Sequence, residues 1–243
     1  MMRLIYAVTI DEPFQNGNTP VVMIAHSMGC PMSLYFLNQQ TKDWKDKYIR
    51  SLVTLAGPWG GSVVSLQIFA VGTDLGLGTS LPIPIPSGLV TDIKDITRFI
   101  ERTQPSLAWM MPSEDIWSGD PLIKTESNSV DYTTANLADY FNLVGVPNMA
   151  MMYQDAQKLT SSLVDPGVEV CNGHGYEKEE KLTIVQVFCF YGTGVPTTEQ
   201  LVYSGAPQSS NPTFNTGYGD GTVNLRSLKV SQVLYKNIRC RNV

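Results

Sequence analysis

Histidine, cysteine and charged residues are all scarce in this sequence. Of its 243 residues only two are histidines and four are cysteines, and charged residues make up 16% of the chain. The cysteines lack the spacing of a metal site and are too few for a disulfide scaffold, so at most one bridge is expected. Chemistry that needs a metal centre is therefore not indicated, and chemistry that needs a histidine has few candidates.

Long apolar runs and excess positive charge are absent as well. No stretch of about 18 apolar residues occurs, so no membrane-spanning segment is expected. Residues 1–10 are briefly apolar but run into Asp11 and Glu12, and we do not interpret them as a signal peptide. The net charge of −5 and a pI near 5.0 argue against a nucleic-acid partner.

The first sixty residues combine strand and helix patterns. Residues 20–25 form a continuous apolar, β-branched run, which predicts a strand buried on both faces. Apolar residues at helical spacing predict a helix from Met28 to about Gln40, and residues 51–56 predict a second strand. Strand, helix and strand with short connections make a βαβ unit, so the sheet here should be parallel.

A different pattern begins at residue 62. Gly- and Pro-rich stretches separate segments that predict helices at about 93–100, 132–143 and 149–163. The first has an apolar face of Ile93, Ile96, Phe99 and Ile100. A helical insertion after a strand is typical of a cap or lid, although ordinary packing helices fit the pattern equally well.

Strand character returns at residues 183–191. A loop rich in Gly, Ser and Pro follows and leads to a sharp turn at 219–223. We therefore expect an α/β fold in which residues 1–61 and 166–243 form the core and residues 62–165 form a helical cap.

Residues 25–29, with the sequence AHSMG, lie directly between the first strand and the first helix. The pattern small-x-Ser-x-Gly at such a junction is that of a nucleophile elbow, here with alanine at the first position. The tight turn raises the hydroxyl of Ser27 and lets the N–H of Met28 face a developing oxyanion. The alternative is a structural serine at a strand end. Adjacent residues in such a turn point to different sides, so His26 is not expected to act as the base for Ser27.

Asp220 is the candidate for the acid of a catalytic triad. It lies between glycines after the last predicted strand, and triads on the α/β-hydrolase fold run in the order Ser, Asp or Glu, His. The alternative is a turn-forming aspartate that caps a helix starting at Thr222. No histidine follows Asp220, and His174 lies upstream in a polar stretch typical of a solvated loop. No catalytic histidine is found, and loss of that residue costs about 10⁶-fold in turnover in subtilisin.

Several blocks in a fixed order resemble one family, that of lecithin:cholesterol acyltransferase. The blocks run from about Thr19 to Ser227 and are Ala25–Gly29, Leu34–Leu37, Trp44–Ile49, Gly57–Gly61, Trp109–Pro112, Trp117, Tyr191–Thr197 and Gly219–Asn224. So many ordered blocks make the resemblance specific.

The resemblance implies an α/β-hydrolase core, with an incomplete parallel sheet in this chain, and a helical cap. It implies a serine enzyme without metal or cofactor that moves an acyl chain from a phospholipid to water or a lipid alcohol. Ser27 matches the nucleophile, Asp220 the triad acid and Met28 the residue whose amide contributes to the oxyanion hole. Such enzymes are lysosomal or secreted and work at a membrane or lipoprotein surface.

The resemblance also implies parts that this sequence does not show. These are an N-terminal portion with further strands and the second oxyanion donor, and a downstream segment with the histidine. We expect truncation at both ends. Three functions stay open: an acyltransferase or phospholipase active in its full-length form, a non-catalytic lipid-binding relative, or a soluble carboxylesterase with another triad partner.

We hypothesise that residues 171–188 are translated intron. In the family, the positions that match Val168–Val170 run almost directly into those that match Cys189–Gly192, whereas here a charged run at 177–180 intervenes. Sequencing of the mature transcript should show an mRNA that lacks these codons and continues past Val243. A transcript that contains them and stops after Val243 would contradict the hypothesis.

Overall fold

The computed structural model describes residues 19–74, 93–126, 129–162, 185–230 and 240–242. The chain divides into two compact units. The first unit comprises Met1–Gly57, Leu163–Tyr191 and Ser231–Val243, and the second comprises Pro58–Ser162 and Gly192–Val230. We expected residues 192–230 to belong with the core, whereas they cluster with residues 58–162. The assignment of core and cap stays a prediction.

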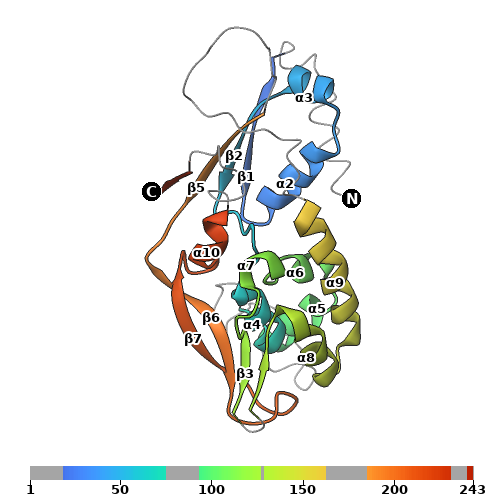
Figure 1. The fold of residues 1–243 in the computed structure, drawn as a ribbon, viewed down its shortest axis with the longest axis vertical. Helices are drawn as coiled ribbons and strands as arrows, with labels where there is room; N and C mark the ends of the chain where they lie inside the picture. The colour runs from blue at the N-terminus through green and yellow to red at the C-terminus, as the bar shows by residue number, and fades with distance from the viewer. Residues whose placement is uncertain (1–18, 75–92, 127–128, 163–184, 231–239, 243) are drawn as a thin grey trace. The chain divides into compact units, whose positions relative to one another are not determined.

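A parallel sheet with strand order β1-β2-β5-β8 forms the first unit (Figure 1). Its strands are β1 (Val21–His26), β2 (Ile49–Leu55), β5 (Gln186–Tyr191) and β8 (Cys240–Asn242). Helices α2 (Gly29–Asn38) and α3 (Lys42–Tyr48) connect β1 to β2. The predicted βαβ unit is therefore confirmed, while α3 and β8 are not indicated by the sequence pattern.

Helix α3 starts where the sequence indicates only a polar break. The Thr41 hydroxyl accepts a hydrogen bond from the Trp44 N–H at 3.3 Å, so it caps the helix. The rings of Trp44 and Phe36 then meet edge to face, with centroids 5.6 Å apart. This short helix is held by its cap and by aromatic packing rather than by a periodic apolar face.

Strand β1 is buried on one face only, so the expectation of a strand buried on both faces is wrong. Met23 and Ala25 are buried, whereas Val22 is 49% and Ile24 is 71% exposed. The register places Ile24 beside Val53 and Val53 beside Phe188, which is 38% exposed. One apolar face of this parallel sheet is thus open to solvent, although parallel sheets are usually covered on both faces.

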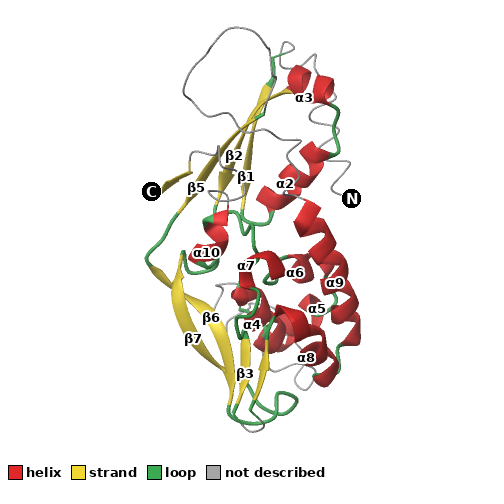
Figure 2. Ribbon diagram, viewed as in Figure 1, coloured by secondary structure: helices red, strands yellow, loops and turns green. Residues whose placement is uncertain are grey.

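The second unit combines helices with a four-stranded sheet of order β4-β3-β6-β7 (Figure 2). The strands are β3 (Ile123–Thr125), β4 (Val130–Tyr132), β6 (Val195–Tyr203) and β7 (Thr213–Gly219). The helices are α4 (Val63–Val71), α5 (Ile93–Glu101), α6 (Pro105–Trp109), α7 (Glu114–Trp117), the 3₁₀ helix η1 (Thr134–Asn136), α8 (Leu137–Leu143), α9 (Pro147–Ser162) and α10 (Leu225–Leu228).

The sequence predicts the helices of this unit better than its strands. The segments at 93–100, 132–143 and 149–163 correspond to α5, α8 and α9, but Tyr132 ends strand β4 and α8 begins only at Leu137. The expected loop after residue 191 is instead the β6–β7 hairpin. The expected apolar face of α5 is only partly covered: Ile93 and Ile96 are half-buried, whereas Phe99 is 75% and Ile100 is 48% exposed.

An aromatic cluster fills the core of the second unit. Phe69 of α4 lies edge to face on Phe141 of α8 at 4.9 Å, and Tyr140 packs on Phe69 and on Tyr203 of β6. The hydroxyls of Tyr140 and Tyr203 are hydrogen-bonded at 2.8 Å, which satisfies both polar ends inside the core. Burial raises the pKa of Tyr140 well above its ordinary value, so this pair stays neutral.

A close backbone approach at Gly61 fixes the start of α4. Gly61 has φ +78°, and a Cβ atom there would lie 2.1 Å from the Met111 carbonyl oxygen. Gly119 also has φ +78°, but a Cβ there would meet nothing within 4 Å. A side chain at either glycine would meet the same backbone strain, but only a side chain at Gly61 would also clash with neighbouring backbone.

We predict that Gly61→Ala lowers the free energy of unfolding by at least about 3 kcal/mol, because a clash with backbone adds to the left-handed strain. Gly119→Ala should cost only about 1–2 kcal/mol, from strain alone. Urea denaturation followed by circular dichroism measures both. Equal losses in the two variants would contradict the close approach at Gly61.

Candidate active site

Ser27 occupies a strained turn between β1 and α2. Its φ is +52°, a left-handed conformation that residues other than glycine seldom adopt. The Ser27 N–H donates to the Leu55 carbonyl at 2.9 Å, and the Cys30 N–H donates to the Ser27 carbonyl at 2.9 Å. The neighbouring strand and the first turn of α2 thus hold the serine backbone from both sides, as a nucleophile elbow requires.

Small residues flank the serine, as the sequence pattern indicates. Ala25 is buried, and a Cβ atom built on Gly29 would lie 3.9 Å from the Ala25 Cβ. That distance is an ordinary van der Waals contact, so the turn has room for one more carbon at Gly29 but not for a long side chain. The steric constraint on Gly29 is therefore milder than the pattern suggests.

The Ser27 hydroxyl and the Met28 N–H lie on adjacent residues of the turn. Among the described residues, neither group makes a hydrogen bond. Met28 has helical dihedral angles and immediately precedes α2, so its N–H is one of the unpaired donors at the start of that helix. A hydroxyl and an N–H left open on adjacent residues can serve as nucleophile and oxyanion donor.

Cys30 lies beneath this turn and is not a second nucleophile. The side chain is fully buried, and its thiol donates to the carbonyl oxygens of Ala25 and Leu55, both at 3.4 Å. Burial raises the pKa of the Cys30 thiol to about 12, so the reactive thiolate is scarce at neutral pH. The residue supports the turn by packing.

Asp220 lies in the second unit, in the turn between β7 and α10. Its Oδ1 accepts hydrogen bonds from the N–H groups of Thr222 at 2.9 Å and Val223 at 2.7 Å. Helix α10 begins at Leu225 and has Asn224 at its N-cap, so the idea that Asp220 caps a helix starting at Thr222 is wrong in position. Asp220 Oδ2 accepts no hydrogen bond from the described residues, which leaves one carboxylate oxygen for another partner.

A buried polar network holds the Asp220 turn. The Asn224 side chain is fully buried, its Oδ1 accepts from the Val63 N–H at 3.1 Å and its Nδ2 donates to the Thr198 carbonyl at 2.8 Å. The Gly60 N–H donates to the Ser227 hydroxyl at 2.9 Å. In the sequence Asn224 stands out only as the last residue of the Gly219–Asn224 block, and no local pattern marks it or Ser227 as buried.

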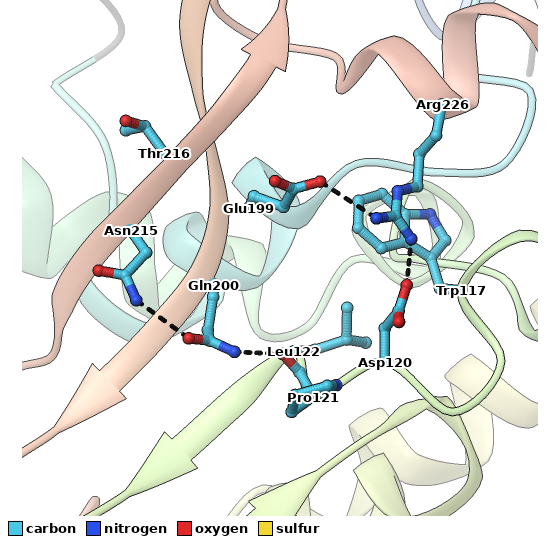
Figure 3. Close-up of a pocket in the computed structure, with 9 residues that line it drawn as sticks. All are labelled: Trp117, Asp120, Pro121, Leu122, Glu199, Gln200, Asn215, Thr216 and Arg226. Carbon is cyan, nitrogen blue, oxygen red and sulfur yellow. Dashed lines mark hydrogen bonds and ion pairs between the residues drawn. The ribbon is translucent and has the colours of Figure 1, made fainter.

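Arg226 ties the same segment to the sheet and to α7 (Figure 3). It forms ion pairs with Asp120 and with Glu199, the latter at 3.3 Å, and its guanidinium lies 4.4 Å from the centre of the Trp117 ring. The Trp117 indole N–H in turn donates to the Gly60 carbonyl at 3.0 Å. These contacts border a polar cavity of about 230 Å³ and restrain α10 directly after the Asp220 turn.

Glu199 reaches Arg226 because of an irregularity in β6. The pairing with β7 shifts register between Thr198 and Gln200, so Glu199 is the extra residue of a bulge. A Cβ on Gly217 would lie 2.0 Å from Glu199 Oε2, so glycine leaves the room that this carboxylate occupies. The bulge thus turns an acidic side chain toward α10.

We predict that Asn224→Ala lowers the free energy of unfolding by about 2–4 kcal/mol, because the Val63 N–H and the Thr198 carbonyl lose their partner. Asn215→Ala is the matched control, since Asn215 is exposed and bonds only the Gln200 side chain, at 3.0 Å. It should change stability by less than about 0.5 kcal/mol. Chemical denaturation measures both, and similar losses would contradict a buried role for Asn224.

The expected site residues divide between the two units. Ser27 and Met28 lie together in the first unit and Asp220 lies in the second. His26 is exposed at the end of β1, and His174 lies outside the described residues. In the described part of the chain, no group of three or more His, Cys, Asp or Glu could hold a metal ion. No described helix is long and apolar enough to cross a membrane.

Comparison with solved structures supports the fold. A chain in the crystal structure of the Tle4–Tli4 complex superposes on 98% of this chain with a TM-score of 0.55, at 12% sequence identity and over 56% of its own length. The parallel sheet with a strained serine between strand and helix is that of the expected α/β-hydrolase class.

Sequence comparison gives the family. This chain is 34% identical to the human lysosomal phospholipase A and acyltransferase, over 90% of its own residues and 45% of that protein. It is 33% identical to lecithin-cholesterol acyltransferase-like 1 of Arabidopsis thaliana and 32% identical to human phosphatidylcholine-sterol acyltransferase. The chain spans about half the length of these relatives. Because the family model matches residues 6–237, the chain belongs to the lecithin:cholesterol acyltransferase family.

Proposed function

We propose that this chain carries the nucleophile of a phospholipase and lipid O-acyltransferase that acts on glycerophospholipids. The observation that carries the proposal is the left-handed Ser27 between β1 and α2, whose hydroxyl and following N–H have no hydrogen-bond partner among the described residues. Relatives named as phospholipase, lysosomal acyltransferase and phosphatidylcholine-sterol acyltransferase support the choice of substrate class.

In the proposed reaction Ser27 Oγ attacks the carbonyl carbon of a phospholipid acyl ester, and its proton passes to a base. The Met28 N–H stabilises the oxyanion of the tetrahedral intermediate. Collapse of that intermediate releases the lysophospholipid, which takes the proton, and leaves an acyl-serine. Water or a lipid alcohol then attacks the acyl-serine and receives the acyl chain, and Ser27 recovers its proton.

Asp220 is the proposed triad acid. One of its oxygens is bound in the turn and the other accepts no hydrogen bond from the described residues, which suits a carboxylate that orients a histidine. We assign the base to neither His26 nor His174. The proposal therefore predicts that the base is missing from these 243 residues.

The proposed partners are a phospholipid donor and a lipid alcohol acceptor at a membrane or lipoprotein surface. Phe99 and Ile100, which α5 exposes to solvent, suit work at such a surface. Relatives named as lysosomal support action in the lysosome, and action outside the cell is the alternative that the family resemblance implies. No nucleic acid is proposed, in keeping with the net charge of −5.

We predict that a fluorophosphonate probe labels Ser27 weakly in the 243-residue chain, because the reagent needs an activated hydroxyl. Peptide mass spectrometry of the labelled protein measures this. The Ser27→Ala variant gives the background labelling. The Ser118→Ala variant, which changes an exposed serine, should leave labelling at Ser27 unaltered. Strong labelling at Ser27 would contradict the missing base.

A chimaera tests the activity itself. Residues 19–170 and 189–227 replace the matching residues of the human lysosomal phospholipase A and acyltransferase, whose remaining segments are proposed to supply the histidine that the resemblance implies. We expect acyl transfer from phosphatidylcholine to a lipid alcohol, with losses of about 10⁶-fold for Ser27→Ala and about 10⁴-fold for Asp220→Asn.

The chimaera also separates the other two functions. Hydrolysis of simple soluble esters without transfer from phosphatidylcholine would point to a carboxylesterase. Lipid binding by a folded but inactive chimaera would point to a non-catalytic relative. Either result, or activity that survives Ser27→Ala, would reject the proposal.

A further inference from the structure

A second polar cavity, of about 330 Å³, lies in the second unit, away from the residues that hold the Asp220 turn. Its lining includes Arg98 of α5, Arg102 directly after that helix, Tyr203 at the end of β6 and residues 207–211 of the following loop. None of the described residues that line it is acidic.

The Arg102 guanidinium is fixed at this cavity. Its Nε donates to the Phe69 carbonyl at 2.9 Å, and its guanidinium carbon lies 4.8 Å from the centre of the Phe69 ring. These contacts hold the planar group without neutralising its charge. The charge is therefore placed before any ligand arrives, which lowers the entropy cost of binding.

Arg98 brings a second positive charge to the same cavity, one helical turn from Arg102. It forms an ion pair with Asp95 at 2.9 Å, and that carboxylate is half exposed, so water screens the pair. Burial, and then the like charge of Arg98, lower the pKa of Arg102. Two cations one turn apart repel each other, and an anion between them relieves that repulsion.

The rest of the lining is neutral and rich in hydrogen-bonding groups. Burial raises the pKa of Tyr203, so its phenol stays protonated and adds no negative charge. Gln208 and Asn211 are exposed polar residues of the loop and can turn their amides toward a ligand, whereas the Ser209 hydroxyl donates to the Ala206 carbonyl at 3.5 Å. Ser210 is already bonded to the Ala206 carbonyl, at 2.8 Å, and shapes the loop.

We propose that this cavity binds a phosphate group between Arg98 and Arg102. Two guanidinium forks match the several oxygens of a phosphate better than the two of a carboxylate, and arginine binds phosphate through paired N–H groups. The phosphate belongs to a small soluble ion or ester or to a phospholipid headgroup, and the recognition chemistry is the same. This site is independent of the proposed catalytic residues.

The test uses isothermal titration of the 243-residue chain with inorganic phosphate at constant ionic strength. We expect binding that Arg98→Gln weakens roughly tenfold, because a charge-assisted hydrogen bond is lost. Gln208→Glu should weaken it similarly by placing a carboxylate in the lining. Thermal melting without ligand checks that each variant folds, and Arg102→Lys tests the fork while keeping the charge.

Two variants serve as matched controls. Lys158→Gln removes a cation from an i,i+3 ion pair of the same kind, with Asp155 at 2.8 Å on α9, and Gln154→Glu adds an acid to the exposed side of that helix. Both should bind phosphate as the unchanged chain does. Equal binding by all variants, equal losses in the controls, or acetate binding as tight as phosphate would overturn the proposal.

Vesicles distinguish the two sources. A lipid headgroup is assigned if the protein sediments with phosphatidylcholine vesicles that contain phosphatidic acid but not with vesicles of phosphatidylcholine alone. The Arg98→Gln variant should then fail to sediment, and inorganic phosphate should compete with the vesicles. Phosphate binding without such sedimentation assigns a soluble ligand. The absence of both kinds of binding rejects the site.

Discussion

The hydrogen bond from the Ser27 N–H to the Leu55 carbonyl is the contact on which the candidate nucleophile depends. It extends the pairing of β1 with β2 by one residue beyond the strand and so holds Ser27 in a left-handed conformation. Ala56 repeats the device on the next strand, since it also has φ +52° and donates to the Phe190 carbonyl at 2.8 Å. Parallel strands end at the same edge of the sheet, so each neighbouring strand offers a carbonyl there. The hydrogen bond to that carbonyl offsets the cost of the left-handed conformation.

The parts of the fold that the sequence predicts are those with a local and continuous signal. Residues 20–25 are an uninterrupted apolar run, residues 51–56 are mostly apolar, and the serine between small residues directly follows the first of these segments. The hairpin of β6 and β7 is missed because Pro196 and the bulge at Glu199 break the alternation that would reveal it. Strands β3 and β4 have three residues each, too few for any periodicity to show.

The residues of the candidate site also differ in whether the local sequence predicts them. Ser27 and Met28 can be proposed from sequence because their chemistry is coded within five consecutive residues. Asp220 needs chain order and a resemblance in addition. Asn224, Ser227 and Arg226 act through partners such as Val63, Gly60 and Asp120, more than a hundred residues away in the chain. The local sequence does not indicate such long-range pairings, so these residues can be identified only from a structure.

The open face of the β1–β2–β5 sheet has a consequence for handling the protein. Ile24, Val53 and Phe188 form a row of apolar side chains across three parallel strands, and Ile24 is 71% exposed. Such a row tends to associate with other apolar surfaces, including the same row on another molecule. Concentrated solutions of these 243 residues should therefore self-associate through this row, and a mild detergent or a polar substitution at Ile24 should disperse them.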